Sequence, residues 1–486
     1  MPERLPAWGI ILRPEPFAPM NQRFIRRRDQ ITVFVAAFAA MLFAIVSTHP
    51  KALNHFDQSF YLTIAYDLDR HGVFSGGKFD QTDSTVERPA PGMFFGPVYP
   101  VLVLAAMRAD ARFAAAVECS VEADHDKRRG ENCEAYALPM HIVHALFLAF
   151  GVLAIGLTGE AMFGGRAMFW LAALVALASL VPHRDLFSFV MTEAVSFGLY
   201  AALGLAAVLG WKSMRPGMIA TAGLLLGVLC LHRPNFLLLL LVVPALTVLA
   251  GYLAGRDSRW RGWLGALAVI AGFVAVVGPW VVRNHVVIGK TALTEEYGAA
   301  AIIERFAYNG MTGREFAAAF PYCIPEIGPP IARGLFGSAA TDRFEWNFPQ
   351  SFFYEGRARR DRLVVQHGRL DSLIPGIIAD ELKRDWPWQI TTSIPLAWCG
   401  MQVAGFWSVV LVPVFLVACI LALRRRQPLF LLYAAPALVM VALHAGVANH
   451  YVRYNLGLIG PFAVGAAWLA IQSFAAMQTR RKARTV

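Results

Sequence analysis

The sequence has few charged residues for its length. Only 16% of its 486 residues are Asp, Glu, Lys or Arg, and 57% are hydrophobic, whereas about a quarter of the residues in a soluble domain are charged. So few charges do not provide a water-soluble surface for a chain of this size, which excludes an ordinary soluble protein. We therefore expect the chain to fold in a lipid bilayer.

Several functional signatures are missing as well. The sequence has no nucleotide-binding glycine motif, no internal repeat and no low-complexity segment. Its net charge of +11 comes mostly from short Lys/Arg clusters beside apolar runs, and such clusters set membrane topology rather than bind nucleic acid. The six cysteines form neither a CxxC motif nor a Cys/His zinc spacing. We predict no nucleic-acid partner, no metal ion and no cofactor.

What the sequence does have is a series of apolar runs long enough to cross a bilayer. A spanning helix needs about 20 apolar residues, or fewer where the helix tilts or the membrane thins. Ten such runs predict an all-α polytopic membrane protein. They lie near residues 31–49, 139–158, 167–182, 191–210, 217–231, 235–250, 262–282, 402–423, 429–447 and 454–475.

Basic clusters at alternate connections give the orientation. With ten spans, every cluster falls on one side of the membrane, and an excess of Lys and Arg marks that side as cytoplasmic. The N-terminal segment 1–30 and the tail 476–486 are then both cytoplasmic. The clusters are Arg26–Arg28, Arg166, Lys212 with Arg215, Arg256–Arg261, Arg424–Arg426 and Arg480–Lys482. Within 217–250, the interruption at Arg233-Pro234-Asn235 favours two short helices over one long helix.

Two long connections then face the outside. The first, residues 50–138, lies within the region 31–282 that holds the first seven spans, and the second, residues 283–400, precedes the last three spans in 401–475. Near the start of the first connection, Tyr61, Ile64, Ala65 and Leu68 recur at helical spacing and Gly72 supplies a helix stop, which is typical of an amphipathic helix on the outer leaflet. The second connection, rich in aromatic residues and prolines, predicts a small helical cap.

A cysteine pair lies in the first outer connection. Cys119 and Cys133 are close in the sequence, and a loop outside the cytoplasm is an environment in which disulfides form and persist. We therefore expect these two residues to form a disulfide, with two free thiols as the alternative.

Charged residues avoid the spans and gather at their outer ends. Charge at a membrane boundary is costly and is usually retained for a partner or substrate, so the five positions on one face suggest a single site. Guanidinium groups suit phosphate, and a carboxylate can take a proton from a hydroxyl group. The five residues are Asp57, Glu193, Arg233, Arg283 and Arg453.

Each of these residues also has a purely structural interpretation. An Arg just beyond a helix end, such as Arg283 or Arg453, can extend its side chain to the membrane interface. Asp57 can cap the helix that follows it. Glu193 can occupy the first turn of its span, where a negative charge suits the helix dipole.

Six motifs follow one another along the chain. They are DQSFYLTIA from Asp57, ERPAPGMFFGPVYP at 87–100, MTEAV at 191–195, GLLLGVLCLHRPN at 223–235, PWVVRNHVVIG at 279–289 and RYNLGLIGPF at 453–462. Their order resembles the GT-C class of membrane glycosyltransferases, particularly the bacterial protein mannosyltransferases and the lipid A aminoarabinose transferase. The chain departs from the class in segment 101–138, which has no family counterpart, and in having ten spans where the class often has eleven or more.

The resemblance implies an inverting glycosyltransferase of the bacterial inner membrane whose active site faces the periplasm. Its donor is a polyprenyl-phosphate sugar, and its acceptor is a lipid, a glycan or a protein of the cell envelope. Because polyprenyl phosphate leaves as a stabilised anion, one carboxylate base suffices, and the resemblance places it at Asp57. The substrate contacts that it implies are Tyr61, Glu87, Arg88, Glu193, Arg233, Arg283, Asn284, Arg453 and Tyr454.

Two other classes of function compete with this interpretation. A secondary transporter or lipid flippase keeps its coupling charges near the bilayer midplane and is built from repeated halves with broken helices, and the sequence shows neither feature. A non-catalytic scaffold is the third possibility, and it gives the charges at the outer face no common role.

Overall fold

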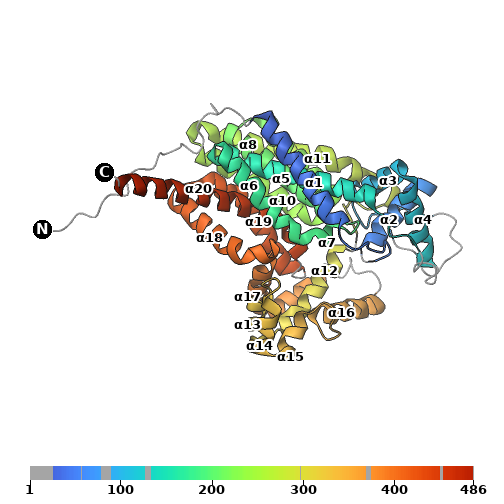
Figure 1. Ribbon diagram of the computed structural model, residues 1–486. Helices are drawn as coiled ribbons and strands as arrows, with labels where there is room; N and C mark the ends of the chain where they lie inside the picture. The colour runs from blue at the N-terminus through green and yellow to red at the C-terminus, as the bar shows by residue number, and fades with distance from the viewer. Residues whose placement is uncertain are drawn as a thin grey trace.

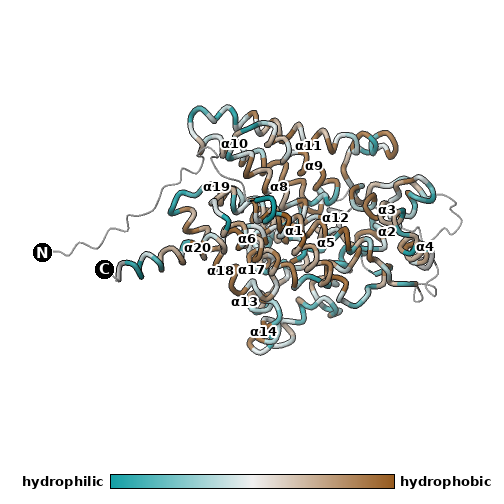
Figure 2. The backbone as a smooth tube through the Cα atoms, turned by 45° about the horizontal axis from the view of Figure 1, so that its top comes forward, coloured by the Kyte–Doolittle hydropathy of each residue, from teal (hydrophilic) through white to brown (hydrophobic). Residues whose placement is uncertain are grey.

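The computed structural model describes residues 26–55, 57–77, 89–125, 133–295, 297–367, 374–448 and 452–484. These residues form helices, and the β-structure among them is an isolated bridge between Ser75 and Pro91. Figure 2 shows that hydrophobic residues predominate along helices such as α9 and α11, while several of the connecting turns are hydrophilic.

The apolar helices form one bundle (Figure 1). Within the described residues, nine helical segments are long and apolar enough to cross a membrane, and the predicted all-α polytopic architecture is confirmed. With the short helical turns that adjoin several of them, these segments contain α1 (Arg27–Val46), α5 (Leu138–Phe163), α6 (Arg166–Leu180), α8 (Glu193–Ser213), α10 (Leu239–Leu253), α11 (Arg259–Ile288), α18 (Ser408–Arg424), α19 (Pro428–Val447) and α20 (Ile459–Arg484).

The remaining predicted span, residues 217–231, corresponds to a shorter helix. Helix α9 (Pro216–His232) is apolar but has only 17 residues, and it packs along α8 and α11. It ends where the sequence predicted a break, because Arg233 has an extended backbone and Pro234 begins a 3-10 helix. This break places the side chain of Arg233 at the turn between α9 and α10 rather than inside an apolar span.

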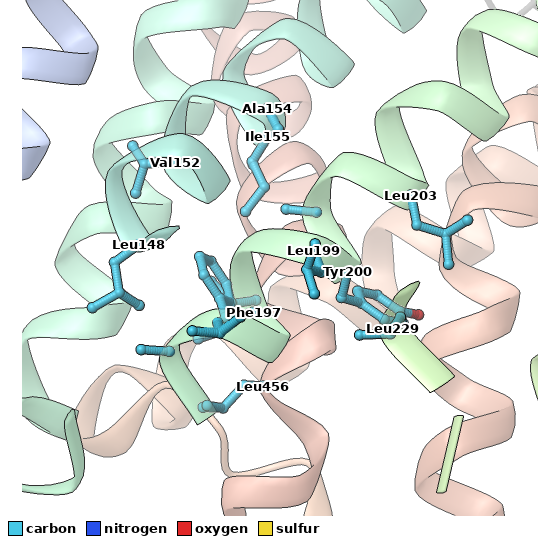
Figure 3. Close-up of a cluster of buried hydrophobic side chains, with 14 of the residues drawn as sticks. Leu148, Val152, Ala154, Ile155, Phe197, Leu199, Tyr200, Leu203, Leu229 and Leu456 are labelled. Atoms are coloured by element: carbon cyan, nitrogen blue, oxygen red, sulfur yellow. The ribbon is translucent and has the colours of Figure 1, made fainter. Parts of the chain in front are cut away.

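Helices α5 and α8 form the centre of the bundle. Their apolar side chains interdigitate with Leu229 of α9 and with Leu456 (Figure 3). The two helices approach closely at Gly198, where an added Cβ atom would lie 2.5 Å from the carbonyl oxygen of Phe147. Because a larger residue would force the helices apart, this contact helps fix the position of Glu193, five residues earlier on α8.

The described part of the first outer connection holds three helices, which lie together at the right of Figure 1. They are α2 (Gln58–His71), α3 (Val98–Ala109) and α4 (Ala111–His125). Helix α2 ends at Gly72, whose φ of 66° is in the left-handed region. The apolar face of α2 contacts protein, because Leu62, Ile64 and Ala65 are fully buried and the helix packs against α3 and α4; its position on the outer leaflet stays a prediction.

The described part of the second outer connection holds six helices, which lie in the lower part of Figure 1. They are α12 (Tyr297–Arg305), α13 (Gly313–Tyr322), α14 (Gly328–Phe336), α15 (Ser338–Thr341), α16 (Phe352–His367) and α17 (Ile374–Gly400). We call these helices the cap. Its small apolar core includes Phe344 and Phe352 and also contacts Ala445 of α19.

Arg305 fastens the cap to the bundle. Its guanidinium is fully buried and donates to the carbonyl oxygen of Ala445 at 2.6 Å and to the hydroxyl of Thr392 at 3.0 Å. Burial lowers the pKa of Arg305 to about 10, so the side chain remains charged at neutral pH. A buried charge with this many hydrogen bonds favours one geometry for the junction between α12, α17 and α19.

The structure contains two disulfides. One joins Cys119 to Cys133, the pair expected from the sequence, and the other joins Cys323 of the cap to Cys399 at the end of α17. No local sequence pattern predicts the second pair, whose members are 76 residues apart. Cys230 and Cys419 are free thiols on bundle helices α9 and α18.

Non-reducing peptide mapping of freshly isolated membranes is expected to recover both disulfides. Both pairs lie in the connections predicted to face an oxidising compartment, where disulfides persist. The bundle cysteines Cys230 and Cys419 are the internal control and are expected as thiols. Recovery of all six cysteines as thiols would contradict the placement of the outer connections.

Candidate functional site

Four of the five charged residues meet at one end of the bundle. Arg453 lies in a 3-10 segment (Val452–Leu458) before α20, and its guanidinium contacts Asp57 Oδ2 at 3.2 Å and Glu193 Oε1 at 3.6 Å. Arg233 contacts the same Glu193 oxygen at 3.3 Å. We call Asp57, Glu193, Arg233 and Arg453 the charged cluster.

The members of the charged cluster differ in exposure. The Glu193 side chain is 3% exposed and that of Arg233 is 13% exposed, whereas Arg453 reaches 22% and Asp57 reaches 35%. A buried carboxylate is stable only when it is paired, and Glu193 is paired with two guanidinium groups. The cluster therefore has a closed end at Glu193 and an open end at Asp57.

Aromatic residues flank the charges. The Tyr454 ring centroid lies 4.8 Å from the guanidinium carbon of Arg233 and 5.2 Å from that of Arg453, within the range of a cation–π contact. Tyr61 of α2 is buried nearby. Burial, followed by the charge of Asp57, raises the pKa of Tyr61 well above its ordinary value. Tyr61 is thus a neutral phenol at neutral pH.

The structure separates the functional and structural interpretations of the two carboxylates. Asp57 occupies the position before α2, but its backbone is helical and its side chain makes no capping hydrogen bond, so the capping interpretation is wrong. Glu193 does lie in the first turn of α8, as its structural interpretation required. It also binds both arginines, which a favourable interaction with the helix dipole alone does not explain.

Gln58 holds Asp57 in place, and sequence reasoning missed it. Its fully buried side chain accepts a hydrogen bond from the backbone nitrogen of Val190 at 2.7 Å and donates to the carbonyl oxygens of Ala52 and His55 at 3.1 and 2.9 Å. The first of these bonds ties the start of α2 to the segment just before Glu193. The available signal was a polar residue directly after Asp57, at the start of a helix whose other buried residues are mostly apolar.

Arg283 and Asn284 do not join the charged cluster. The Arg283 guanidinium donates to the carbonyl oxygens of Gly92 at 2.7 Å and Phe74 at 3.1 Å, and the Asn284 amide donates to that of Ala292 at 2.8 Å. These two side chains therefore brace the backbone of the outer connections. The structure does not bring them into contact with the charged cluster, and their role in binding substrate stays a prediction.

The remaining sequence predictions concern Glu87, Arg88 and metal binding. Glu87 and Arg88 lie outside the described residues. In the described part of the chain, no group of three or more His, Cys, Asp or Glu side chains is arranged to hold a metal ion. Asp69, the second aspartate of a DxD sequence on α2, forms an ion pair with Arg108 at 3.0 Å. The charged cluster thus offers cationic groups for an anion and one accessible carboxylate for a proton.

Comparison with known proteins gives a fold and no family. No family model matches the chain, and no curated protein matches it. Among solved structures, the archaeal oligosaccharyltransferase AglB from Archaeoglobus fulgidus, in complex with an inhibitory peptide and a dolichol-phosphate, is similar with a TM-score of 0.50 and 14% identity. The match covers 95% of this chain and 52% of AglB, so the chain spans about half the length of that protein.

A second solved protein is similar at a lower score. ArnT from Cupriavidus metallidurans, bound to undecaprenyl phosphate, has 17% identity and a TM-score of 0.37 over 90% of this chain and 78% of ArnT. The likeness to AglB, a GT-C membrane glycosyltransferase, shows that the chain has the fold of this class. The resemblance predicted from the motif order is therefore confirmed at the level of the fold.

Proposed function

We propose that this protein is an inverting glycosyltransferase that moves a sugar from a polyprenyl-phosphate donor to an acceptor at the outer face of the cytoplasmic membrane. The observation that carries the proposal is the unequal exposure of two carboxylates that share Arg453, since Asp57 is 35% exposed and Glu193 is 3% exposed. The first can reach an acceptor, while the second is a buried counter-charge. The dolichol-phosphate in the structure of AglB supports a polyprenyl phosphate as the sugar carrier.

Asp57 is the proposed base. Its carboxylate takes the proton from the acceptor hydroxyl as the hydroxyl oxygen attacks the anomeric carbon, and the bond between that carbon and the phosphate oxygen breaks. The bonding electrons leave with the phosphate. A single displacement of this kind inverts the anomeric centre. The carrier leaves as a stabilised anion, so the reaction needs no general acid, unlike glycoside hydrolysis with its two carboxylates.

Arg233 and Arg453 are the proposed phosphate contacts. A guanidinium presents several donors in a planar fork that matches phosphate oxygens, and both groups lie against Tyr454 at the same end of the bundle. Glu193 keeps the two guanidinium groups together before the donor arrives. Tyr61 and Tyr454 complete the proposed substrate contacts, and Glu87 and Arg88 stay predictions from the sequence.

Mass spectrometry of the cell envelope tests this proposal. Cells that lack the gene are expected to accumulate a sugar-loaded polyprenyl phosphate and to lose that sugar from one envelope lipid, glycan or protein. Purified protein, supplied with that donor and the sugar-deficient acceptor, is expected to release free polyprenyl phosphate. A flippase would change the membrane side of a lipid without releasing its carrier, and an unchanged set of envelope sugars would overturn the proposal.

A further inference from the structure

Three polar side chains connect the two segments that carry the arginines of the charged cluster. We call these segments the arginine loops: one is the turn after α9 that contains Arg233, and the other is the 3-10 segment that contains Arg453. The Asn235 amide donates to Nε2 of His444 at 3.0 Å, and Nδ1 of His444 donates to Oδ1 of Asn455 at 2.8 Å. Since an amide nitrogen is on one side and an amide oxygen is on the other, the imidazole is the neutral tautomer with its proton on Nδ1. We call Asn235, His444 and Asn455 the amide–imidazole bridge.

The bridge joins the segments on which the spacing of the arginines depends. Asn235 lies two residues after Arg233, and Asn455 lies two residues after Arg453. His444 comes from α19, a third element, and its ring centroid lies 5.5 Å from that of Tyr454. The bridge therefore fixes the position of one arginine loop relative to the other at a point directly behind the charged cluster.

The cap holds His444 from the opposite side. The guanidinium of Arg305 and the hydroxyl of Ser393 both donate to the carbonyl oxygen of Ala445, at 2.6 and 3.1 Å, and Gln389 donates to the carbonyl oxygen of Gly446. These carbonyls belong to the two residues after His444. The last turn of α19 is thus fixed between the cap and the arginine loops.

We propose that His444 is a positioning residue that sets the separation of Arg233 and Arg453 so that one anionic group can engage both. Both of its ring nitrogens are occupied by amides, so it does not transfer a proton to or from substrate. The identity of the anion, the phosphate of a polyprenyl carrier, rests on the proposed function. The effect of His444 on the arginine pair depends only on the contacts described above.

Two glycines near the amide–imidazole bridge allow it to be displaced without replacing any of its three residues. An added Cβ atom at Gly400, at the end of α17, would lie 2.6 Å from the Asn455 amide nitrogen, whereas one at Gly446 would meet nothing within 4 Å. Gly400→Ala therefore displaces Asn455 from His444 without changing a residue of the charged cluster. Gly446→Ala adds the same methyl group to neighbouring open space and is the matched control.

The first test measures binding of undecaprenyl phosphate alone to purified full-length variants in one detergent. His444→Ala and Gly400→Ala are expected to weaken binding by about 5- to 30-fold, the range that follows from losing one or two hydrogen bonds. Gly446→Ala is expected to bind as the unchanged protein does. His444→Asn, which keeps a donor near Nδ1, and His444→Gln, which keeps an acceptor near Nε2, are expected to be intermediate. Unchanged binding by His444→Ala, or an equal loss in Gly446→Ala, overturns the proposal.

The second test determines the positions of Arg233 and Arg453 in a structure without a ligand. In an experimental structure of Gly400→Ala, at least one of the contacts from Arg233 and Arg453 to Glu193 is expected to be lost. If both contacts remain, His444 does not set the arginine spacing and the proposal is wrong. Failure of the unchanged protein to bind undecaprenyl phosphate would count against the proposed function, and this structure would still decide the role of His444.

Discussion

Replacing Asp57 with Asn is expected to lower the rate of sugar transfer by about 10²–10⁴-fold, which is the usual contribution of a general base. The amide keeps the shape of the carboxylate and can still interact with its surroundings, but it does not accept the proton of the acceptor hydroxyl. The measurement is the initial rate of transfer by purified protein with a defined polyprenyl-phosphate sugar. Membrane insertion and melting temperature are expected to change little, since the Asp57 side chain is partly exposed and caps no helix.

Asp69→Asn is the matched control for Asp57→Asn. Both carboxylates are 35% exposed, both form an ion pair with an arginine at 3.0–3.2 Å, and Asp69 lies on the helix that Asp57 precedes. Asp69→Asn is expected to retain normal transfer because its partner, Arg108, is outside the charged cluster. Full activity of the Asp57→Asn protein would remove Asp57 from the mechanism.

The sequence predicted the members of the charged cluster from their positions at the ends of the spans. Charges at the outer ends of several apolar runs must lie on one face, and this argument correctly brought Asp57, Glu193, Arg233 and Arg453 together. It did not bring Arg283 to the same carboxylates, because position does not tell whether a guanidinium meets a carboxylate or a backbone carbonyl. Helix α11 continues to Ile288, and Arg283 instead binds the carbonyls of the outer connection.

Other features depend on tertiary contacts that leave no local pattern. The apolar face of α2 fits an outer leaflet as well as it fits a protein, and only α3 and α4, which were not expected, decide between the two. His444 is a single polar residue in an apolar run, which is ordinary in a helix core. Its role depends on Asn235, 209 residues away in the chain. A disulfide between Cys323 and Cys399 likewise follows only from the folded cap.

Replacing Glu193 with Gln is expected to destabilise the protein and to weaken transfer together. Glu193 is the buried partner of Arg233 and Arg453, and its loss removes the counter-charge that the two guanidinium groups share, although Arg453 keeps its contact with Asp57. Breaking a buried ion pair costs about 3–5 kcal/mol. We expect the lower end, about 3 kcal/mol, because glutamine retains an oxygen that can accept a hydrogen bond and both arginines are partly exposed. The measurement is thermal unfolding of purified protein, with the transfer rate determined on the same preparation.

Glu315→Gln provides the comparison within the cap. Glu315 is also largely buried and pairs with Arg343 at 3.2 Å, but it lies in a capping box at the start of α13 that glutamine can maintain. This variant is expected to lose little stability and to keep its transfer rate.

The decisive outcome concerns which carboxylate is the base. If Glu193→Gln abolished transfer at an unchanged melting temperature while Asp57→Asn remained active, Glu193 would be the base and not the counter-charge of the arginines. A loss of stability with residual transfer, beside a stable but inactive Asp57→Asn protein, assigns the two roles as proposed, because only a buried counter-charge affects both the fold and the arginines that hold the phosphate.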